Sequence, residues 1–336
     1  EGSILPNGRI ITPQGTQITT APHPYVLVLS ADGSVAVTAN SGTNPFSISI
    51  IRNPLSSTPS VQQIPEGAKT ESGVLEACFM GLAISPDNRT VYVAGGQANQ
   101  VFLFDLTTGK RGEPINCATR TEEADYTHGY IGDMALTRDG RTLYAVDQIG
   151  FRLVVIDTRS RKVLHSIPTG RYPFGITLSP DETRVFVANV GVFEYKPFTD
   201  LDPKNIKNTA HSWPSSKYGS KEMLEGDPAK GVPALGDPNA PEAFSVWSYT
   251  LTNGKPTVKG KIKTGFLVGQ KVEDFPAVGG SSPNSLVATD RYVFVSNGNN
   301  DCVSVIDIEK DTVVSTLFLN PEPRLRSLRG VIPFGL

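Results

Sequence analysis

The most regular feature of the chain is a short apolar strand, a polar turn and a second apolar strand. In four copies the turn carries Ser or Thr with Asp two residues later, and an Asp there can bond the backbone N–H groups ahead of it. The residues after the turn are β-branched or aromatic and alternate, which indicates a strand. The copies lie at residues 29–40, 84–95, 136–146, 178–189 and, in a degenerate form, 286–297.

Two further strands follow the repeated core. A third strand that ends in Asp is expected at residues 101–105, 153–157 and 303–307, and a fourth at residues 162–167 and 312–318. The Asp that ends the third strand is expected to cap a tight turn. Four antiparallel strands in each repeat of ~40–55 residues describe a propeller blade. The sequence therefore predicts an all-β chain that forms a β-propeller with four-stranded blades.

The spacing of the repeats is interrupted by a long insertion at residues 192–243. This segment is rich in Pro, Gly, Asp and Lys and has no period, and strand character resumes at residues 244–250 and 258–263. The insertion is therefore expected between strands of the fourth blade. Long segments without regular structure are usually functional or flexible. An ordered cap over one face, a contact with a partner and a flexible loop are the three interpretations.

The segment that opens the fourth repeat, residues 170–176, recurs at residues 330–336. We therefore expect five blades and the first strand of a sixth in a single, incomplete propeller domain over residues 1–336. An incomplete ring leaves an open sheet edge, which is an aggregation liability. We therefore expect the chain to be a fragment, a cleaved subunit or one piece of a propeller ring. The remainder of its own polypeptide or another chain would complete that ring.

Composition narrows the class of protein. Of the 336 residues, 38% are apolar and 19% are charged, which argues against disorder of the whole chain. The net charge of −2 removes the main electrostatic reason to expect nucleic acid or an anionic membrane surface as a partner. No stretch approaches the ~20 apolar residues that span a bilayer, so no membrane insertion is expected. A chain that begins at Glu1 without Met fits a processed secreted protein or a trimmed chain.

The three cysteines, Cys78, Cys117 and Cys302, form neither a CxxC nor a CxxCH motif. This spacing argues against a zinc ribbon and against covalent c-type haem. One disulfide between Cys78 and Cys117 is one interpretation. Small buried thiols are the other.

Candidate ligand-binding residues precede the predicted inner strands. In propellers the loops that enter these strands line one end of the central channel, where a small ligand can bind. Packing at the blade junctions would use the same aromatic residues, and the Pro-Phe pairs at 173–174 and 333–334 fit that interpretation better. The candidates at this channel mouth are His23, Tyr25, His128, Tyr130, Tyr172 and Asn284.

No catalytic residue is assigned. The repeated Asp residues fit a turn role, and neither a GxSxG elbow nor a Gly-rich phosphate loop is present. No cofactor is evident, with calcium as the one candidate. Asp200, Asp202 and Asn205 resemble the start of a calcium loop but lack its Gly and distal Glu. Solvated turn residues are the alternative for these three.

The repeats resemble YVTN-family propellers, which are related to the WD40-like class. Residues 5–15, 214–222, 232–242 and 282–286 resemble one group more closely. This group is the bacterial YncE-like proteins fused to an alkaline-phosphatase-type phosphoesterase domain. The resemblance implies an N-terminal, typically seven-bladed propeller, a following metal-dependent hydrolase domain and a secreted or periplasmic parent. The chain ends before the ring and the hydrolase domain, so no hydrolytic residue is carried over.

Three functions follow as hypotheses. The leading one is a non-catalytic binding or scaffold module of a secreted phosphoesterase-like protein, which positions a catalytic domain or binds a partner. The second is a propeller subunit of a multi-protein or cell-surface complex. The third is a small-molecule enzyme of the lactonase or redox type that uses the channel mouth. The sequence contains neither a haem-attachment motif nor a cluster of catalytic residues, which weighs against the enzyme hypothesis.

Overall fold

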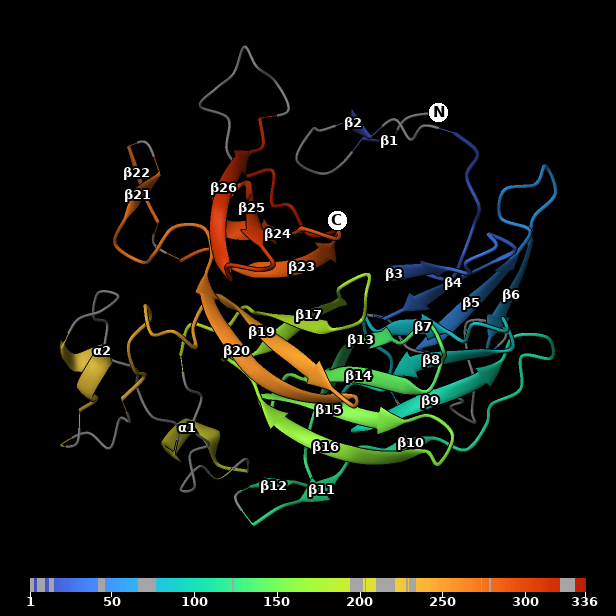
Figure 1. Cartoon of the computed structure of the whole chain (residues 1–336), viewed down its shortest axis with the longest axis horizontal. Coiled ribbons are helices and arrows are strands. Elements are labelled where there is room, and N and C mark those ends of the chain that lie inside the picture. The colour runs from blue at the N-terminus through green and yellow to red at the C-terminus, as the bar shows by residue number, and fades with distance from the viewer. Residues whose placement is uncertain are drawn as a thin grey trace. The chain divides into compact units, whose positions relative to one another are not determined.

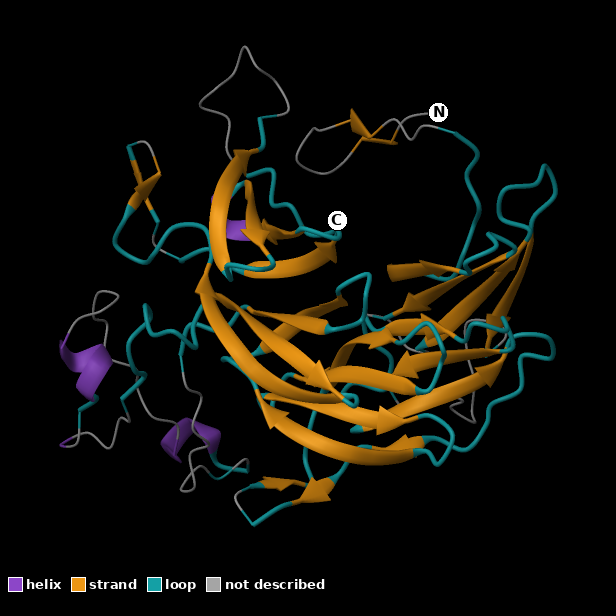
Figure 2. Ribbon diagram, in the orientation of Figure 1, coloured by secondary structure: helices purple, strands orange, loops and turns teal. Residues whose placement is uncertain are grey.

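In the computed structural model the regular secondary structure is almost entirely β-strand (Figures 1 and 2). Its compact parts are two units, residues 1–93 with 102–113 and residues 94–101 with 114–336. No helix in the described part of the chain is long and apolar enough to cross a membrane. The structure describes residues 3–4, 10–11, 15–41, 46–65, 77–122, 124–193, 202, 204–209, 221–227, 229, 234–272, 274–277, 279–320 and 330–336.

The first unit contains a four-stranded antiparallel sheet in the order β3-β4-β5-β6 (blue in Figure 1). A two-stranded pair, β1 (Ser3–Ile4) and β2 (Ile10–Ile11), precedes it. Strand β7 (Leu82–Ile84) packs against β3 and β4. The strands of this sheet are β3 (Pro24–Leu29), β4 (Val35–Asn40), β5 (Ser47–Arg52) and β6 (Ser60–Ile64).

The second sheet has the order β10-β9-β8-β7. Its remaining strands are β8 (Thr90–Ala94), β9 (Gln100–Asp105) and β10 (Ile115–Asn116). A short pair, β11 (Thr119–Arg120) and β12 (Asp125–Tyr126), follows it in the chain.

The described part of the second unit contains three further four-stranded sheets, each with its strands in sequence order. The third sheet consists of β13 (Ile131–Leu136), β14 (Thr142–Asp147), β15 (Arg152–Asp157) and β16 (Lys162–Pro168). The fourth consists of β17 (Pro173–Leu178), β18 (Arg184–Asn189), β19 (Ser245–Thr252) and β20 (Lys255–Lys263). The fifth consists of β23 (Pro283–Ala288), β24 (Tyr292–Asn297), β25 (Cys302–Asp307) and β26 (Thr312–Phe318).

The described residues thus form five four-stranded antiparallel sheets, which confirms the predicted all-β class and the four strands of each repeat. Residues 330–336, where the repeat predicts the first strand of a further blade, form no strand. Each first strand pairs with the strand that follows it in sequence, as β17 does with β18. The backbone of residues 330 and 332 instead donates to the carboxylate of Asp301.

The turn chemistry is as expected. Asp32 Oδ1 accepts the Ser30 hydroxyl at 2.7 Å and the Ser34 N–H at 3.0 Å, which closes the turn between β3 and β4. The same two bonds form at Asp87, Asp139 and Asp181. These hydrogen bonds hold the pKa of each carboxyl below its usual value. The third strands also end as predicted, with turn N–H groups donating to Asp105, Asp157 and Asp307.

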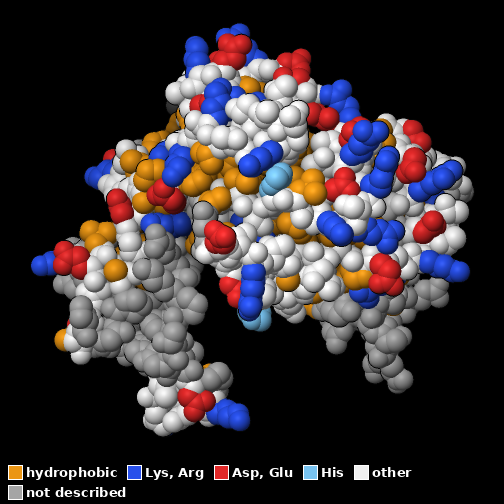
Figure 3. All heavy atoms as spheres, turned by 60° about the horizontal axis from the view of Figure 1, so that its bottom comes forward, with side chains coloured by type: hydrophobic (Ala, Val, Ile, Leu, Met, Phe, Trp, Pro, Cys, Tyr) orange, Lys and Arg blue, Asp and Glu red, His pale blue; other side chains and the backbone are white. Residues whose placement is uncertain are grey.

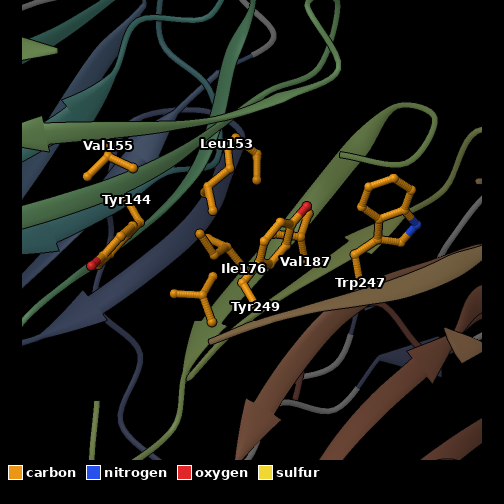
Figure 4. Close-up of a cluster of buried hydrophobic side chains, with 9 residues drawn as sticks. Tyr144, Leu153, Val155, Ile176, Val187, Trp247 and Tyr249 are labelled. Atoms are coloured by element: carbon orange, nitrogen blue, oxygen red, sulfur yellow. The ribbon is translucent and has the colours of Figure 1, made fainter. Parts of the chain in front are cut away.

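One core cluster of the second unit lies between the third and fourth sheets (Figure 4), and another lies between the fourth and fifth. Side chains from β14 and β15 meet those of β17, β18 and β19, as expected for strands whose alternate residues point to one face. Two of its aromatic rings, Trp247 and Tyr249, have centroids 6.4 Å apart. The cluster consists of Tyr144, Val146, Leu153, Val155, Ile176, Val185, Val187, Trp247 and Tyr249.

The long insertion leaves the fourth sheet after β18 and returns before β19. Its described parts include the short helices α1 (Ile206–Thr209) and α2 (Lys221–Glu225). The buried Arg171 contacts both ends of the insertion. Its Nη1 donates to the carbonyls of Val192 and Asp237 at 2.7 and 2.8 Å. Near the return point, Lys263 Nζ donates to the carbonyls of Ala240 and Ala243, and burial lowers the pKa of Lys263 to about 8. Hydrogen bonds from Arg171 and Lys263 therefore connect the base of the insertion to the fourth sheet.

Candidate functional site

The first strands of three sheets begin with the same local structure. The residue before a proline adopts a left-handed backbone, with φ of 55° at His23, 51° at Tyr172 and 54° at Ser282. Each proline is followed by a β-bulge, at Tyr25, Phe174 and Asn284, where the register shifts against the second strand. Bulges redirect a side chain away from the regular alternation of a strand. Ile332, before Pro333, has the same backbone at φ 50°.

In the first unit, His23 and Tyr25 are both exposed. The Tyr25 ring stacks on Phe79 with centroids 5.8 Å apart and planes at 27°. The two predicted residues lie close together in the chain at the opening of β3, and one face of the Tyr25 ring is used for packing.

In the second unit, Asn284 is buried and its side chain is used internally. Its Oδ1 accepts the Ser296 hydroxyl at 2.6 Å, and its Nδ2 donates to the Pro333 carbonyl at 3.2 Å. The neighbouring bulge residue Phe174 makes an edge-to-face contact with Phe334, with centroids 5.8 Å apart. These contacts pack the opening of β17 and β23 against residues 333–334.

The other predicted residues of the second unit lie at separate loops. Tyr172 is half-buried, and its carbonyl accepts the Val190 N–H at 3.1 Å. His128 is exposed, and Tyr130 lies beside Gly96. Of the six candidates, Tyr25 borders one of the two hollows described below, and the channel-mouth site stays a prediction.

The calcium candidates bond within their own turn. Asp202 Oδ1 accepts the Lys204 N–H, and Asn205 Oδ1 accepts the Asn208 side-chain amide. Asp200 lies outside the described residues. Within the described ranges, no group of three or more His, Cys, Asp or Glu side chains could hold a metal ion.

All three cysteines are free and buried, so the structure contains no Cys78–Cys117 disulfide. Burial raises the pKa of Cys78 and of Cys117 to about 12. Buried thiols with such pKa values carry little thiolate and are unreactive. The alternative interpretation, small buried thiols, is the one observed.

A fully buried ion pair holds the third sheet, and sequence reasoning missed it. Arg152 Nε donates to Asp147 Oδ2 at 2.8 Å, and the guanidinium also bonds Thr119, Ser166 and the Cys117 carbonyl. The second strands of three other sheets end in Asn at this position, and Asn40, Asn189 and Asn297 donate to the third strand of their own sheet. The signal in the sequence was the change from Asn to Asp in one repeat.

Asp133 was also missed. This half-buried carboxylate on β13 accepts the N–H of Met134 at 2.9 Å and the N–H of Ile176, on β17 of the next sheet, at 3.1 Å. Withdrawal from water raises the pKa of Asp133 to about 6, although both hydrogen bonds oppose the rise.

A cavity of ≈ 500 Å³ lies in the second unit beside the turn between β24 and β25. One wall is this turn, which includes the 3-10 helix η2 (Gly298–Asn300), and another is the segment after β20 with β21 (Lys271–Val272) and β22 (Phe275–Pro276). The lining residues are Val272, Pro276, Ala277, Gly279, Gly280, Gly298, Asn299, Asn300, Asp301, Gly330 and Ile332. None of the six predicted site residues lines it.

A second hollow, a groove of ≈ 440 Å³, lies on the first sheet in the first unit. Thr16, Ile18 and Thr20 form one side of it, and residues of β3 form the floor. Leu27, at the centre of β3, is 59% exposed. The leucine at the same repeat position in β7, Leu82, is 7% exposed, and Ile176 in β17 is 6% exposed. The first sheet therefore exposes an apolar position of β3 that the equivalent strands β7 and β17 bury.

The surface carries charges of both signs. On the face drawn in Figure 3, Lys and Arg side chains are interspersed with Asp and Glu. The net charge of −2 fits this mixture.

Comparison with known sequences gives one partial match. No protein-family sequence model matches the chain. The adipocyte plasma membrane-associated protein of Rattus norvegicus is 25% identical over 130 residues, which are 34% of this chain and 34% of that protein. The chain thus spans about a third of the length of the curated relative it matches.

Solved structures resemble the fold over most of the chain. A functionally unknown protein from Desulfotomaculum acetoxidans DSM 771 superposes with a TM-score of 0.55 at 16% identity, over 93% of this chain and 76% of that one. A candidate 6-phosphogluconolactonase from Bacteroides uniformis ATCC 8492 gives 0.54 at 13%, over 94% and 77%. The WD40 repeats of RRP9 give 0.51 at 11%, over 92% and 68%. Identities this low show the fold alone, and they confirm a WD40-like β-propeller.

Proposed function

We propose that the chain is a non-catalytic binding module that receives a further antiparallel sheet on the groove of its first sheet. The observation that carries the proposal is the 59% exposure of Leu27 on β3. Large exposed apolar surfaces in soluble proteins mark interaction sites, and β3 also exposes Tyr25 and Leu29.

The packing of the other sheets indicates what fits on this surface. Within the first unit, β7 packs against β3 and β4. Within the second unit, β17 packs against β13 and β14, and β23 packs against β17 and β18. Each of these first strands therefore lies against the first two strands of the preceding sheet. The equivalent partner for β3 is the apolar face of another sheet of the same kind.

The proposed source of that sheet is the remainder of the chain's own polypeptide, in a secreted or periplasmic, phosphoesterase-like parent protein. The support is the resemblance of residues 5–15, 214–222 and 232–242 to YncE-like proteins fused to a phosphoesterase domain. In such a parent the module positions the catalytic domain. The alternative source is another chain of a multi-protein or cell-surface complex, and the test must distinguish the two sources.

The test compares one introduced thiol in two settings. Leu27→Cys is introduced into the 336-residue chain and into the gene product isolated whole, and labelling by a maleimide is timed. Leu164→Cys, at a site 53% exposed on β16, controls for reagent access, and Leu82→Cys controls for a covered site. The native thiols are buried and contribute little. In the 336-residue chain, we expect the Leu27→Cys thiol to label as fast as the Leu164→Cys thiol. In the gene product, we expect the Leu27→Cys thiol to label at least about tenfold more slowly.

The outcomes separate the sources of the sheet. Equal labelling of the Leu27→Cys variant in both settings contradicts the docking surface. A gene product with a denatured mass of 36.1 kDa contradicts the remainder of the polypeptide as the partner, even if a second chain protects the thiol introduced by Leu27→Cys. Hydrolysis of p-nitrophenyl phosphate by the gene product, and not by the 336-residue chain, is expected for a phosphoesterase-like parent. Equal hydrolysis by both contradicts a non-catalytic module.

A further inference from the structure

We propose that the cavity beside the fifth sheet binds a ligand that carries an ammonium or guanidinium group on an aliphatic chain. The cavity lies wholly in the second unit, and the inference is independent of docking at the first sheet. Its volume of ≈ 500 Å³ falls in the range of small-molecule sites.

The charge of the ligand follows from Asp301. Among the residues that line the cavity, Asp301 is the one that carries a charge. Its side chain is buried and forms no ion pair with any residue that the structure describes. A buried carboxylate is costly unless a charge or several hydrogen bonds compensate it. Two backbone N–H groups donate to the Asp301 carboxylate and compensate part of this cost. A cationic group in the cavity would supply the opposite charge that no described residue supplies.

The carboxylate is already oriented. Asp301 adopts a left-handed backbone with φ 47° and ψ 42°. Its Oδ2 accepts the Gly330 N–H at 2.7 Å and its Oδ1 accepts the Ile332 N–H at 2.9 Å. A carboxylate has about four acceptor sites, so these two bonds leave capacity for donors on a ligand. The exposed Asn299 adds a second acceptor, because its Nδ2 donates to the Gly279 carbonyl and its Oδ1 accepts from no residue in the described ranges.

The rest of the wall favours an aliphatic chain. Val272, Pro276, Ala277 and Ile332 contribute apolar side chains. Acceptor groups at one part of a cavity and aliphatic groups at another match an alkylamine, or the side chain of Lys or Arg. This chemistry could belong to a free amine or to a basic residue of a peptide.

Asparagine side chains lie close to the glycine backbone that lines the cavity. A Cβ on Gly279 would lie 2.9 Å from Asn299 Nδ2, and one on Gly298 would lie 2.9 Å from Asn284 Nδ2. Asn300 Nδ2 donates to the Gly280 carbonyl at 3.0 Å, and Asn300 Oδ1 accepts the Phe266 N–H at 2.8 Å. These bonds fix the segment before β23 to the turn after β24. A cavity held in this way loses little conformational entropy when a ligand binds.

The experiment measures binding of n-pentylamine to the 336-residue chain by titration calorimetry and by shifts of the amide signals of Gly279, Gly298 and Gly330. We expect saturable binding of n-pentylamine and at least tenfold weaker binding of n-pentanol and of pentanoate, which have similar chains without the positive charge. A second titration uses Nα-acetyl-lysine methylamide. Tighter binding of the lysine derivative assigns the site to basic peptides, and tighter binding of pentylamine assigns it to free amines.

Two variants locate the site. Asp301→Asn keeps an acceptor but removes the charge, and should weaken pentylamine binding about 10- to 100-fold. Ala277→Leu fills the apolar side, leaves the carboxylate in place, and should also abolish binding, so the proposal is testable even if Asp301→Asn does not fold. Asp290→Asn, an exposed carboxylate on the turn at the opposite end of β23 and β24, changes the net charge equally and should have no effect. Unsaturable binding, equal binding of n-pentanol, or unchanged binding in Ala277→Leu would overturn the proposal.

Discussion

The first and fourth sheets have the same strand order and the same turn chemistry, yet their first strands lie in opposite surroundings. Leu27 on β3 is 59% exposed, whereas Ile176, at the same repeat position on β17, is 6% exposed and belongs to the core cluster. The neighbours differ too. The Ile176 N–H is bonded by Asp133 of the preceding sheet, and β18 begins with the buried Arg184 where β4 begins with Val35.

This difference shows that the repeat pattern determines the sheet but not what covers it. The same apolar position stabilises the fold where a preceding sheet packs on it. Where the position is open, it is available for binding. Substitutions at matched positions of the two sheets measure this distinction directly.

The largest effect is expected for Ile176→Ala. Removing a buried Ile side chain leaves a cavity within the cluster that also contains Val187 and Tyr249. We expect the free energy of unfolding to fall by about 3 to 4 kcal/mol. Urea unfolding followed by circular dichroism measures it. A loss below about 1 kcal/mol would mean that the cluster is not tightly packed.

Arg184→Met tests the contact between the fourth and fifth sheets. The Arg184 guanidinium donates to Asp311 Oδ1 at 2.6 Å, to the Ile308 carbonyl at 2.9 Å and to the Tyr249 carbonyl at 3.3 Å. Methionine keeps the length of the side chain and removes the charge. We expect a loss of about 2 to 3 kcal/mol, because Lys259 remains 3.1 Å from Asp311 and limits the cost of the unpaired carboxylate.

The control for Arg184→Met is Arg138→Met, since the exposed Arg138 lies 3.8 Å from the half-buried Glu182 in a more solvated pair. Exposed pairs contribute about 0 to 1 kcal/mol. Similar losses in the two variants would contradict a specific anchoring role for Arg184.

The strands and turns were predictable because their signals are local. The predicted fourth strand at residues 312–318 is β26 as observed, and the predicted third strand at residues 153–157 begins one residue earlier as β15. Alternation and Asp turns depend on neighbouring residues only. The exposure of Leu27 was not predictable, because it depends on whether another sheet packs on β3.

The candidate site was less predictable for the same reason. The ligand role of Asn284 stays a prediction, and the bonds of its side chain to Ser296 and Pro333 depend on residues farther along the chain. Asp301, which carries the charge of the cavity, follows an ordinary Asn-rich turn in the sequence. Its importance comes from the segment at residues 330–332, which lies far along the chain and contributes to the same cavity.

Asp133→Asn is expected to stabilise the chain, with a gain that grows as the pH rises from about 4 to about 6 and stays constant above that. Burial raises the pKa of Asp133 to about 6, from the 3.8 of an unperturbed Asp. The folded chain therefore binds this proton more tightly than the unfolded chain does. The contribution is fully present below about pH 4 and is lost as the pH rises through about 6.

The expected gain for Asp133→Asn at about pH 7.5 is about 2 kcal/mol. A rise of about two in the pKa of Asp133 corresponds to about 3 kcal/mol in the free energy of unfolding. Solvent around the half-buried carboxylate reduces this value. Asparagine retains an acceptor for the Ile176 N–H. Urea unfolding at about pH 4 and about pH 7.5 measures the difference. A gain of the same size at both pH values would show that the effect is not due to the proton.

The smallest effect is expected for Leu27→Ala in the 336-residue chain. A side chain that is 59% exposed loses little burial when it is shortened, so the free energy of unfolding should change by less than about 0.5 kcal/mol. The same substitution in the whole gene product should cost about 2 to 3 kcal/mol if a further sheet covers β3, which is close to the expected cost at Ile176. The first sheet would then resemble the fourth once its partner is present. A loss below about 0.5 kcal/mol in both proteins would show that β3 stays open, and the groove would then need another explanation than docking of a sheet.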